Sequence, residues 1–336
     1  MSNLKNIKLL IVGCGSIGKR HIKNAILNGI QPENIISIDN RKDRLEEVKK
    51  LGIKNFFLDF DEGIKSNFDA AVICSPTSMH IKQSLKIASL KKHLLIEKPL
   101  DSKLDGADEL LSITKKQNLV AMIAYIFRFM PSIQFVKKKL LENTIGKVYY
   151  FRGEFSEFLP DWHPYEDYRK FYMARKDQGG GSILDQCHIM DLSHYLIGEF
   201  SSVQAINLKV SNLEIEADDI SEMIIKHKNG VISSIHTDIF GRSHKKNLEI
   251  KGEKGNICWD FYKNEVQIYD EKSKKNETFS NFDKDVNQSY KDEIHHFLDC
   301  FINNKTTNIP LEDGIHTLKL ILAAERSSKT KKEEII

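Results

Sequence analysis

Residues 7–18 read IKLLIVGCGSIG, an apolar run that passes directly into three closely spaced glycines. A continuous apolar run of this length is typical of a strand buried on both faces of a parallel sheet. Gly13 permits a tight turn, Gly15 lets the backbone approach a ligand, and Gly18 lets the next helix pack closely on the strand. From Ser16 onward the apolar residues recur at helical spacing. The segment therefore predicts a strand, a glycine-rich turn and a helix in succession.

An acidic residue follows this turn at the spacing of a dinucleotide-binding unit. Residues 35–38 form a second apolar run, and Asp39 ends it, 21 positions beyond Gly18. The helix that opens at Ser16 offers its amino terminus to phosphate charge, while Asp39 accepts hydrogen bonds from the adenosine ribose. We expect NAD rather than NADP, because a carboxylate repels a 2′-phosphate. NADP remains an alternative because Arg41 could pair with that phosphate.

Apolar runs alternate with helix-like stretches through the first third of the chain. This alternation is typical of right-handed βαβ units, which build a doubly wound parallel sheet. We expect an α/β dinucleotide-binding domain over residues 1–125, with strands at residues 7–12, 35–38, 55–58, 70–74, 94–96 and 119–125.

The pattern changes after about residue 145, where strand-like runs follow one another at short spacing. Parallel crossovers need a dozen or more residues, so this spacing predicts antiparallel pairing. Two helices are expected, at residues 182–196 and 313–327. We assign residues 126–336 to a second α/β domain, with strands at residues 147–155, 203–209, 221–227, 231–239, 246–252, 256–261 and 265–269.

Length and charge limit the partners that the chain can have. Its 336 residues suit two domains. Lys and Arg number 50 against 47 Asp and Glu, a formal charge of +3, so neither nucleic acid nor an anionic membrane is indicated. The five cysteines include no C-x-x-C pair, which predicts reduced thiols in a cytoplasmic protein. The first apolar run is too short to span a bilayer and lacks a signal peptide's cleavage site.

Two short polar motifs follow the fourth and fifth predicted strands. One is C-S-P-T at residues 74–77, and the other is E-K-P at residues 97–99. Open parallel sheets bind ligands at the carboxyl ends of their strands, so both motifs are expected beside the cofactor, with Lys98 near its nicotinamide. The candidate cofactor-binding residues are Gly13, Gly15, Ser16, Ile17, Gly18, Asp39, Arg41, Ser75, Pro76, Thr77, His80, Glu97 and Lys98.

A third motif lies at the junction of the two predicted domains, and a fourth begins at a triple glycine. Tyr125, Arg128, Phe129 and Pro131 form a Y-x-x-R-F-x-P pattern, and residues 179–188 read GGGSILDQCH. With the glycine-rich turn and E-K-P, these motifs resemble the Gfo/Idh/MocA family of sugar and cyclitol oxidoreductases. The resemblance spans essentially the whole chain. It implies a Rossmann domain followed by an α/β domain on a large open antiparallel sheet.

The resemblance also implies a pair of catalytic residues. In the family, the E-K-P lysine and a histidine on the helix after the triple glycine flank the reacting carbinol; these positions are Lys98 and His188 here. Asp185 and Asp191 each lie three residues from His188, so each shares a helix face with it. A carboxylate that orients an imidazole is a common arrangement for proton transfer. We expect Lys98, His188 and Asp185 to be catalytic, and leave open whether Asp185 or Asp191 supports the histidine.

The segment before the triple glycine is rich in aromatic and cationic side chains. Aromatic faces stack on sugar rings, and arginine pairs with carboxylate or phosphate. The segment resembles a subset of the family associated with bacterial surface-sugar biosynthesis, which favours an anionic or nucleotide-linked sugar. The alternative is that these aromatic residues only pack the loop. The candidate substrate-binding residues are Lys98, Arg128, Trp162, His163, Tyr168, Arg169, Tyr172, Arg175, Asp185 and His188.

These observations together predict an NAD(P)-dependent enzyme that transfers a hydride to or from a secondary hydroxyl or ketone of a sugar derivative. His188 would take the hydroxyl proton, and Lys98 would polarise the developing carbonyl. One alternative is transient oxidation by tightly bound NAD during epimerisation, elimination or glycoside hydrolysis. Another is a sensor of NAD or sugar. No metal is expected, because H-E-x-x-H and zinc-spaced cysteines do not occur.

The second predicted sheet carries apolar residues on both faces. Residues 223–225 are consecutive apolar residues, as are 231–232. Neighbouring strands therefore point apolar side chains to both sides, whereas the two predicted helices can cover only one. A large exposed apolar face marks an association surface. We expect a homodimer or homotetramer through this sheet.

Overall fold

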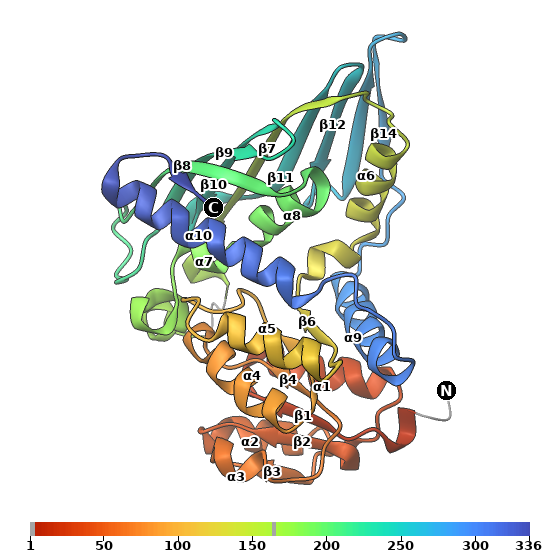
Figure 1. Ribbon diagram of the computed structural model, residues 1–336, viewed down its shortest axis with the longest axis vertical. Helices are drawn as coiled ribbons and strands as arrows, with labels where there is room; N and C mark the ends of the chain where they lie inside the picture. The colour runs from red at the N-terminus through yellow and green to blue at the C-terminus, as the bar shows by residue number, and fades with distance from the viewer. Residues whose placement is uncertain (1–3, 163–165) are drawn as a thin grey trace. The chain divides into compact units, whose positions relative to one another are not determined.

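The computed structural model describes residues 4–162 and 166–336, which divide into two units (Figure 1). The first unit holds the described residues up to Ile126 together with Asn287–Ile315. The second holds the described residues of Phe127–Val286 together with His316–Ile336. The sequence pattern places everything after residue 125 in the second domain, whereas the contacts of Asn287–Ile315 place that segment in the first unit.

The first unit is built on a six-stranded parallel sheet in the order β3-β2-β1-β4-β5-β6 (Figure 1). This is the strand order of a doubly wound dinucleotide-binding sheet. All six predicted strands are present, and the central ones are buried along their length because helices cover both faces. The strands are β1 (Leu9–Val12), β2 (Ile35–Ile38), β3 (Asn55–Phe57), β4 (Ala70–Ile73), β5 (His93–Ile96) and β6 (Ala121–Ile123). The helices are α1 (Ser16–Leu27), α2 (Lys42–Lys49), α3 (Phe60–Gly63), α4 (His80–Ser89) and α5 (Ala107–Lys116).

A further helix, α9 (Val286–Ile302), joins this unit from far along the chain. Asn287 Nδ2 donates to Asn24 Oδ1 on α1 at 3.0 Å, and Asn28 Nδ2 donates to the Lys291 carbonyl at 3.0 Å. One turn of α9 is thereby fixed against α1. Its apolar face, which includes Ile294 and Phe297, is fully buried. This helix is not among those expected from the sequence pattern.

The second unit is built on a nine-stranded sheet in the order β14-β13-β12-β11-β7-β10-β9-β8-β15 (Figure 1). Its pairs are antiparallel except β7–β10, which is parallel. That pair can form because a long connection through two helices, β8 and β9 separates its strands. The strands are β7 (Val148–Phe158), β8 (Phe200–Leu208), β9 (Ile220–His227), β10 (Ile232–Asp238), β11 (Phe240–Gly252), β12 (Gly255–Asp260), β13 (Glu265–Asp270), β14 (Lys275–Phe279) and β15 (Glu334–Ile335).

Helices cover one face of this sheet. They are α6 (Pro131–Leu141), α7 (Ser182–Asp185) and α8 (His188–Ile197), while α10 (Leu311–Thr330) lies against β8 through Ser327 and Ser328. Gly153 on β7 leaves room for Ile189 of α8, whose Cδ1 would lie 2.5 Å from a Cβ at that glycine. The helix predicted over residues 182–196 is instead two helices, α7 and α8. No helix among the described residues is long and apolar enough to cross a membrane.

Candidate active site

The glycine-rich turn between β1 and α1 has the shape that a dinucleotide requires. Gly13 has φ +91°, and a Cβ there would lie 2.5 Å from the Cys74 carbonyl oxygen. A Cβ on Gly18 would lie 1.9 Å from the Gly13 carbonyl oxygen, so helix and turn touch at this point. A Cβ on Gly15 would meet only Arg44, at 3.8 Å, so space is open above that residue. The turn, with Ser16 starting α1, therefore fits a bound pyrophosphate at the helix amino terminus.

Asp39 is held at the end of β2 by the turn itself. Its Oδ2 accepts a hydrogen bond from the Cys14 amide at 2.8 Å, and its Oδ1 accepts one from the Arg41 amide at 2.9 Å. Burial and the nearby Asp39 carboxylate raise the pKa of the Cys14 thiol to about 12. The thiol therefore stays protonated, and Asp39 supplies the negative charge at this edge of the sheet.

The residues after β4 form a turn that hydrogen bonds connect to the turn after β5. The Ser75 hydroxyl donates to Gln83 Oε1 at 2.6 Å, and buried Thr77 begins the helical turn Thr77–Met79 after Pro76. His80 Nε2 lies 2.8 Å from the Ser75 carbonyl oxygen, and its Nδ1 lies 2.9 Å from the Pro99 carbonyl oxygen. His80 therefore links the C-S-P-T turn to the E-K-P turn. Both motifs lie where the sequence analysis predicts them, at carboxyl ends of neighbouring strands.

Glu97 is buried directly after β5 and is held there by two hydrogen bonds. His21 Nε2 lies 2.7 Å from Glu97 Oε1, and the Lys98 amide donates to Oε2 at 3.2 Å. Burial raises the pKa of Glu97, but the His21 hydrogen bond and the nearby Lys98 charge outweigh burial, so the pKa lies below its ordinary value. A charged Glu97 therefore stands beside Lys98, whose side chain is partly exposed.

Helix α9 adds residues to this edge that the sequence analysis missed. The Tyr290 ring meets His21 edge-on with centroids 6.3 Å apart, and the Arg20 guanidinium lies 4.5 Å from the Tyr290 ring centre. Glu293 is fully buried one turn further on, and burial with the nearby Glu97 charge holds its pKa well above the ordinary value. The apolar spacing of α9 was the available signal, but only the fold shows where this helix packs.

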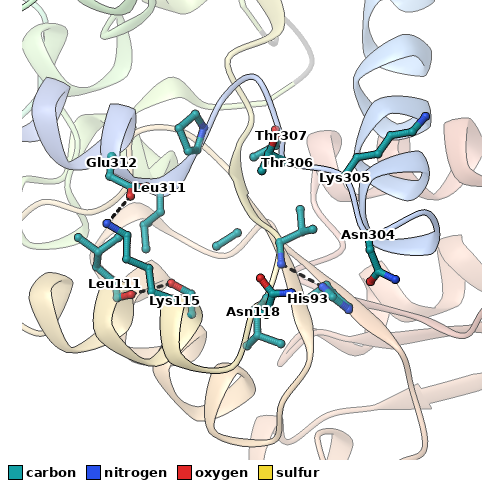
Figure 2. Close-up of a pocket in the computed structure, with 15 residues that line it drawn as sticks. His93, Leu111, Lys115, Asn118, Asn304, Lys305, Thr306, Thr307, Leu311 and Glu312 are labelled. Carbon is teal, nitrogen blue, oxygen red and sulfur yellow. Dashed lines mark hydrogen bonds and ion pairs between the residues drawn. The ribbon is translucent and has the colours of Figure 1, made fainter.

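A cavity of about 280 Å³ opens elsewhere in the first unit (Figure 2). It lies at the amino ends of β5 and β6, where the Val120 amide donates to His93 Nδ1 at 3.0 Å. An ion pair between Lys115 and Glu312, 2.7 Å long, crosses its lining. Glu97 follows the opposite end of β5, so this cavity is not part of the candidate active site.

In the second unit, the triple glycine packs closely against the chain. A Cβ on Gly180 would lie 2.4 Å from the carbonyl oxygens of both Tyr172 and Met173. A Cβ on Gly181, which has φ +121°, would lie 2.3 Å from Asp218 Oδ1. Asp218 accepts the Ile183 amide at 3.0 Å, and burial raises its pKa to about 6. These contacts fix the start of α7, the helix that carries Asp185.

His188 begins α8 and is partly buried, with its ring centroid 4.8 Å from that of Phe127. The Tyr172 hydroxyl donates to Asp185 Oδ1 at 3.1 Å. Arg128 donates two hydrogen bonds to Asp191, from Nε to Oδ2 at 3.0 Å and from Nη2 to Oδ1 at 2.5 Å. Both side chains of that ion pair are buried. Asp185 is thus linked to the substrate segment, and Asp191 to the Y-x-x-R-F-x-P motif.

The predicted substrate segment folds onto a small hydrophobic cluster of its own. Trp162, Tyr168 and Tyr172 pack against buried residues that include Leu159 and Met173. His163 lies outside the described residues. The two candidate cations pair with carboxylates: Arg169 bonds to Asp167 and Glu214, and Arg175 bonds to Asp177. Within residues 4–162 and 166–336, no group of His, Cys, Asp or Glu is arranged to hold a metal ion.

Two sequence profiles of one oxidoreductase family match the chain. Residues 7–125 match its NAD-binding Rossmann fold, and residues 137–335 match its C-terminal α/β domain. The chain belongs to the Gfo/Idh/MocA oxidoreductase family. The resemblance carried by the four motifs is therefore confirmed, and residues 7–125 form an NAD-binding Rossmann fold.

Relatives of known activity match over nearly the whole chain. A myo-inositol 2-dehydrogenase of Thermotoga maritima is 29% identical over 98% of this chain and 100% of its own length. A scyllo-inositol 2-dehydrogenase (NAD(+)) of Bacillus subtilis is 26% identical over 96% of this chain and 94% of its own. The solved structure of a levoglucosan dehydrogenase with NADH has a TM-score of 0.88 at 20% identity, over 98% of this chain and 99% of that one. This last likeness shows the fold.

Proposed function

We propose that the protein is an NAD-dependent dehydrogenase that oxidises a secondary hydroxyl of a sugar or polyol, or reduces the matching ketone. The observation that carries the proposal is the Gly13–Gly18 turn, whose open side at Gly15 fits a pyrophosphate, in a chain that also carries Lys98 and His188. The inositol and sugar dehydrogenases among its relatives support the same class of substrate.

Each candidate residue has a role that its surroundings support. A nicotinamide bound at the first sheet would accept the hydride. His188 takes the hydroxyl proton as a general base, and the Lys98 ammonium stabilises negative charge on the substrate oxygen. Charged Glu97 accepts the Lys98 amide and so holds the backbone of the lysine in place. Asp185 acts as a positioning residue, held by the Tyr172 hydroxyl.

The substrate class that we propose is neutral rather than anionic. The arginines of the substrate segment that could receive an anion already bond to Asp167, Glu214 and Asp177. An added phosphate or carboxylate would have to displace these partners. Tyr168 and Tyr172 present partly buried aromatic rings beside them, which suit a sugar ring. A nucleotide-linked or acidic sugar is the competing substrate class.

A ligand screen tests this proposal. We would measure the melting temperature with NAD and then add inositols, neutral sugars, sugar acids, sugar phosphates or nucleotide sugars, because a ligand of the native state raises that temperature. The expected result is a shift with NAD and a further shift with a neutral polyol, followed by NADH formation from the same compound. A further shift only with an anionic sugar would reject the neutral class. No shift with any dinucleotide would reject the function.

We also propose that two copies of the chain pair through the open face of the second sheet. Ile206 and Leu208 on β8 and Ile224 on β9 are about half exposed on neighbouring strands of that face. Two-fold pairing would bury them against the same patch of a second copy. Light scattering should then give a multiple of 38.7 kDa, and Ile206→Lys with Ile224→Lys should give the monomer. Leu141→Lys, at an exposed position on α6, is the control; a wild-type monomer at micromolar concentration contradicts pairing.

A further inference from the structure

Two arginines follow Asp39, and only one of them lies over the cofactor turn. The Arg41 guanidinium faces Asp43, with Nε 3.1 Å from Oδ1, and both side chains are exposed. Arg44 lies within α2, and its Nη1 is 3.5 Å from Asp39 Oδ2. The same Nη1 is 3.8 Å from the position of a Cβ on Gly15. Arg44 therefore spans the acidic residue and the glycine at which the backbone is open to a ligand.

Asp39 can still accept hydrogen bonds from a ribose, while the positive charge of Arg44 lies close to its carboxylate. Two backbone amides fix the carboxylate, one on each oxygen. A carboxylate accepts about four hydrogen bonds, so acceptor capacity remains. Exclusion of NADP depends on an acidic side chain that repels the 2′-phosphate. Here a guanidinium 3.5 Å away offsets that repulsion.

Two other cations near this turn have shorter contacts with carboxylates. Lys19 on α1 forms an ion pair with Glu47 on α2, and Arg41 forms one with Asp43. The Arg44 contact with Asp39 is longer than a good charge-assisted hydrogen bond, and the Arg44 side chain is 38% exposed. A small rotation of the planar Arg44 guanidinium would let it donate two parallel hydrogen bonds to a phosphate.

We propose that Arg44 binds the 2′-phosphate of NADP, so that the protein accepts NADP as well as NAD, with Asp39 serving the ribose of NAD. The proposal deepens the proposed function, since it rests on a dinucleotide being the cofactor. It also moves the phosphate-binding role from Arg41, which the sequence offers only as an alternative, to a residue one turn further along.

Binding measurements test the assignment without relying on turnover. Isothermal titration calorimetry would give the Kd of NAD, NADP and 2′,5′-ADP for the wild type, Arg44→Ala and Arg41→Ala. We expect wild-type Kd values for NADP and NAD within about tenfold of each other. Arg44→Ala should weaken NADP and 2′,5′-ADP by about tenfold or more, because it removes charged hydrogen bonds, and NAD by less than about threefold. Arg41→Ala should leave all three within about twofold.

A second variant separates this role from an effect on folding. Arg44→Gln keeps a polar side chain but removes the positive charge, and it should lose NADP affinity as Arg44→Ala does. Equal weakening of NAD and NADP would place Arg44 on the pyrophosphate and overturn the proposal. Unchanged NADP binding in both Arg44 variants, selective loss in Arg41→Ala, or a wild type that does not bind NADP would overturn it as well. Failure of the wild type to bind either dinucleotide would instead reject the proposed function itself.

Discussion

The two glycine-rich segments of the molecule use missing side chains for opposite purposes. At Gly15 in the first unit a Cβ would meet only the tip of Arg44, at 3.8 Å. At Gly180 in the second unit a Cβ would meet two backbone carbonyl oxygens at 2.4 Å. The first segment leaves space for a ligand, and the second lets the chain pack against itself. Ligand binding in the first unit therefore depends on open space, whereas the candidate residues of the second depend on contacts with one another.

The buried Arg128–Asp191 ion pair should be the costliest of these internal contacts to break. Arg128→Met leaves the Asp191 carboxylate buried without a guanidinium partner. We expect a loss of about 3–5 kcal/mol in the free energy of unfolding. Urea unfolding measures the loss. Arg41→Ala, which breaks an exposed ion pair, should cost less than about 1 kcal/mol. A cost below 1 kcal/mol for Arg128→Met would show that the second unit does not depend on this contact.

Removal of either proposed catalytic side chain should reduce turnover by about a hundredfold or more, the usual scale for an acid–base group. We would measure kcat and the Kd of NAD for Lys98→Ala and His188→Ala. The Kd of NAD should change little in His188→Ala, because His188 belongs to the second unit. Lys103→Ala and His295→Ala, at exposed positions, are the matched controls. Turnover like that of the wild type would remove the residue concerned from the mechanism.

Alanine substitutions at Gly180 and at Gly15 test whether the two glycine-rich segments have these different roles. Gly180→Ala should destabilise the protein by about 1–3 kcal/mol through overpacking and leave the Kd of NAD unchanged. Gly15→Ala should leave unfolding within about 0.5 kcal/mol of the wild type, yet weaken NAD by about tenfold because it fills ligand space. Both variants need only urea unfolding and calorimetry. The reverse pattern would mean that the two segments have been assigned the wrong roles.

Two histidines of the second unit should give smaller, opposite pH effects. Burial, with His316 nearby, lowers the pKa of His194 to about 3. The free energy of unfolding should therefore fall as pH falls below about 6.5, because the unfolded chain binds a proton at this histidine that the native protein does not. The slope is at most about 1.4 kcal/mol per pH unit, and His194→Phe should flatten it. Asp238 and Glu222 raise the pKa of His236 to about 9, so its contribution is lost as pH rises from about 6.5 to 9. Melting temperatures from pH 5 to 9 test both; parallel profiles for the wild type and His194→Phe would contradict the first.

The sequence predicts the first sheet well because its signals are local. The apolar run before Gly13 and the acidic residue after the second run define strands and turn within 40 residues of chain. The Arg128–Asp191 pair joins residues 63 positions apart, and no local pattern indicates it. Arg44 was missed for a related reason, since only the path of α2 brings it to Asp39. The parallel β7–β10 pair likewise follows from a long connection that spacing does not reveal.

The most direct test of the proposed dehydrogenase is the stoichiometry of reduced cofactor. We would incubate the purified protein with NAD and a polyol identified by the ligand screen, and measure NADH absorbance against the amount of ketone product. The proposed function predicts one NADH for each ketone formed, with the rate reduced by about a hundredfold in His188→Ala. Product that accumulates with no net NADH would contradict it, since the oxidation would then be a transient step of another reaction.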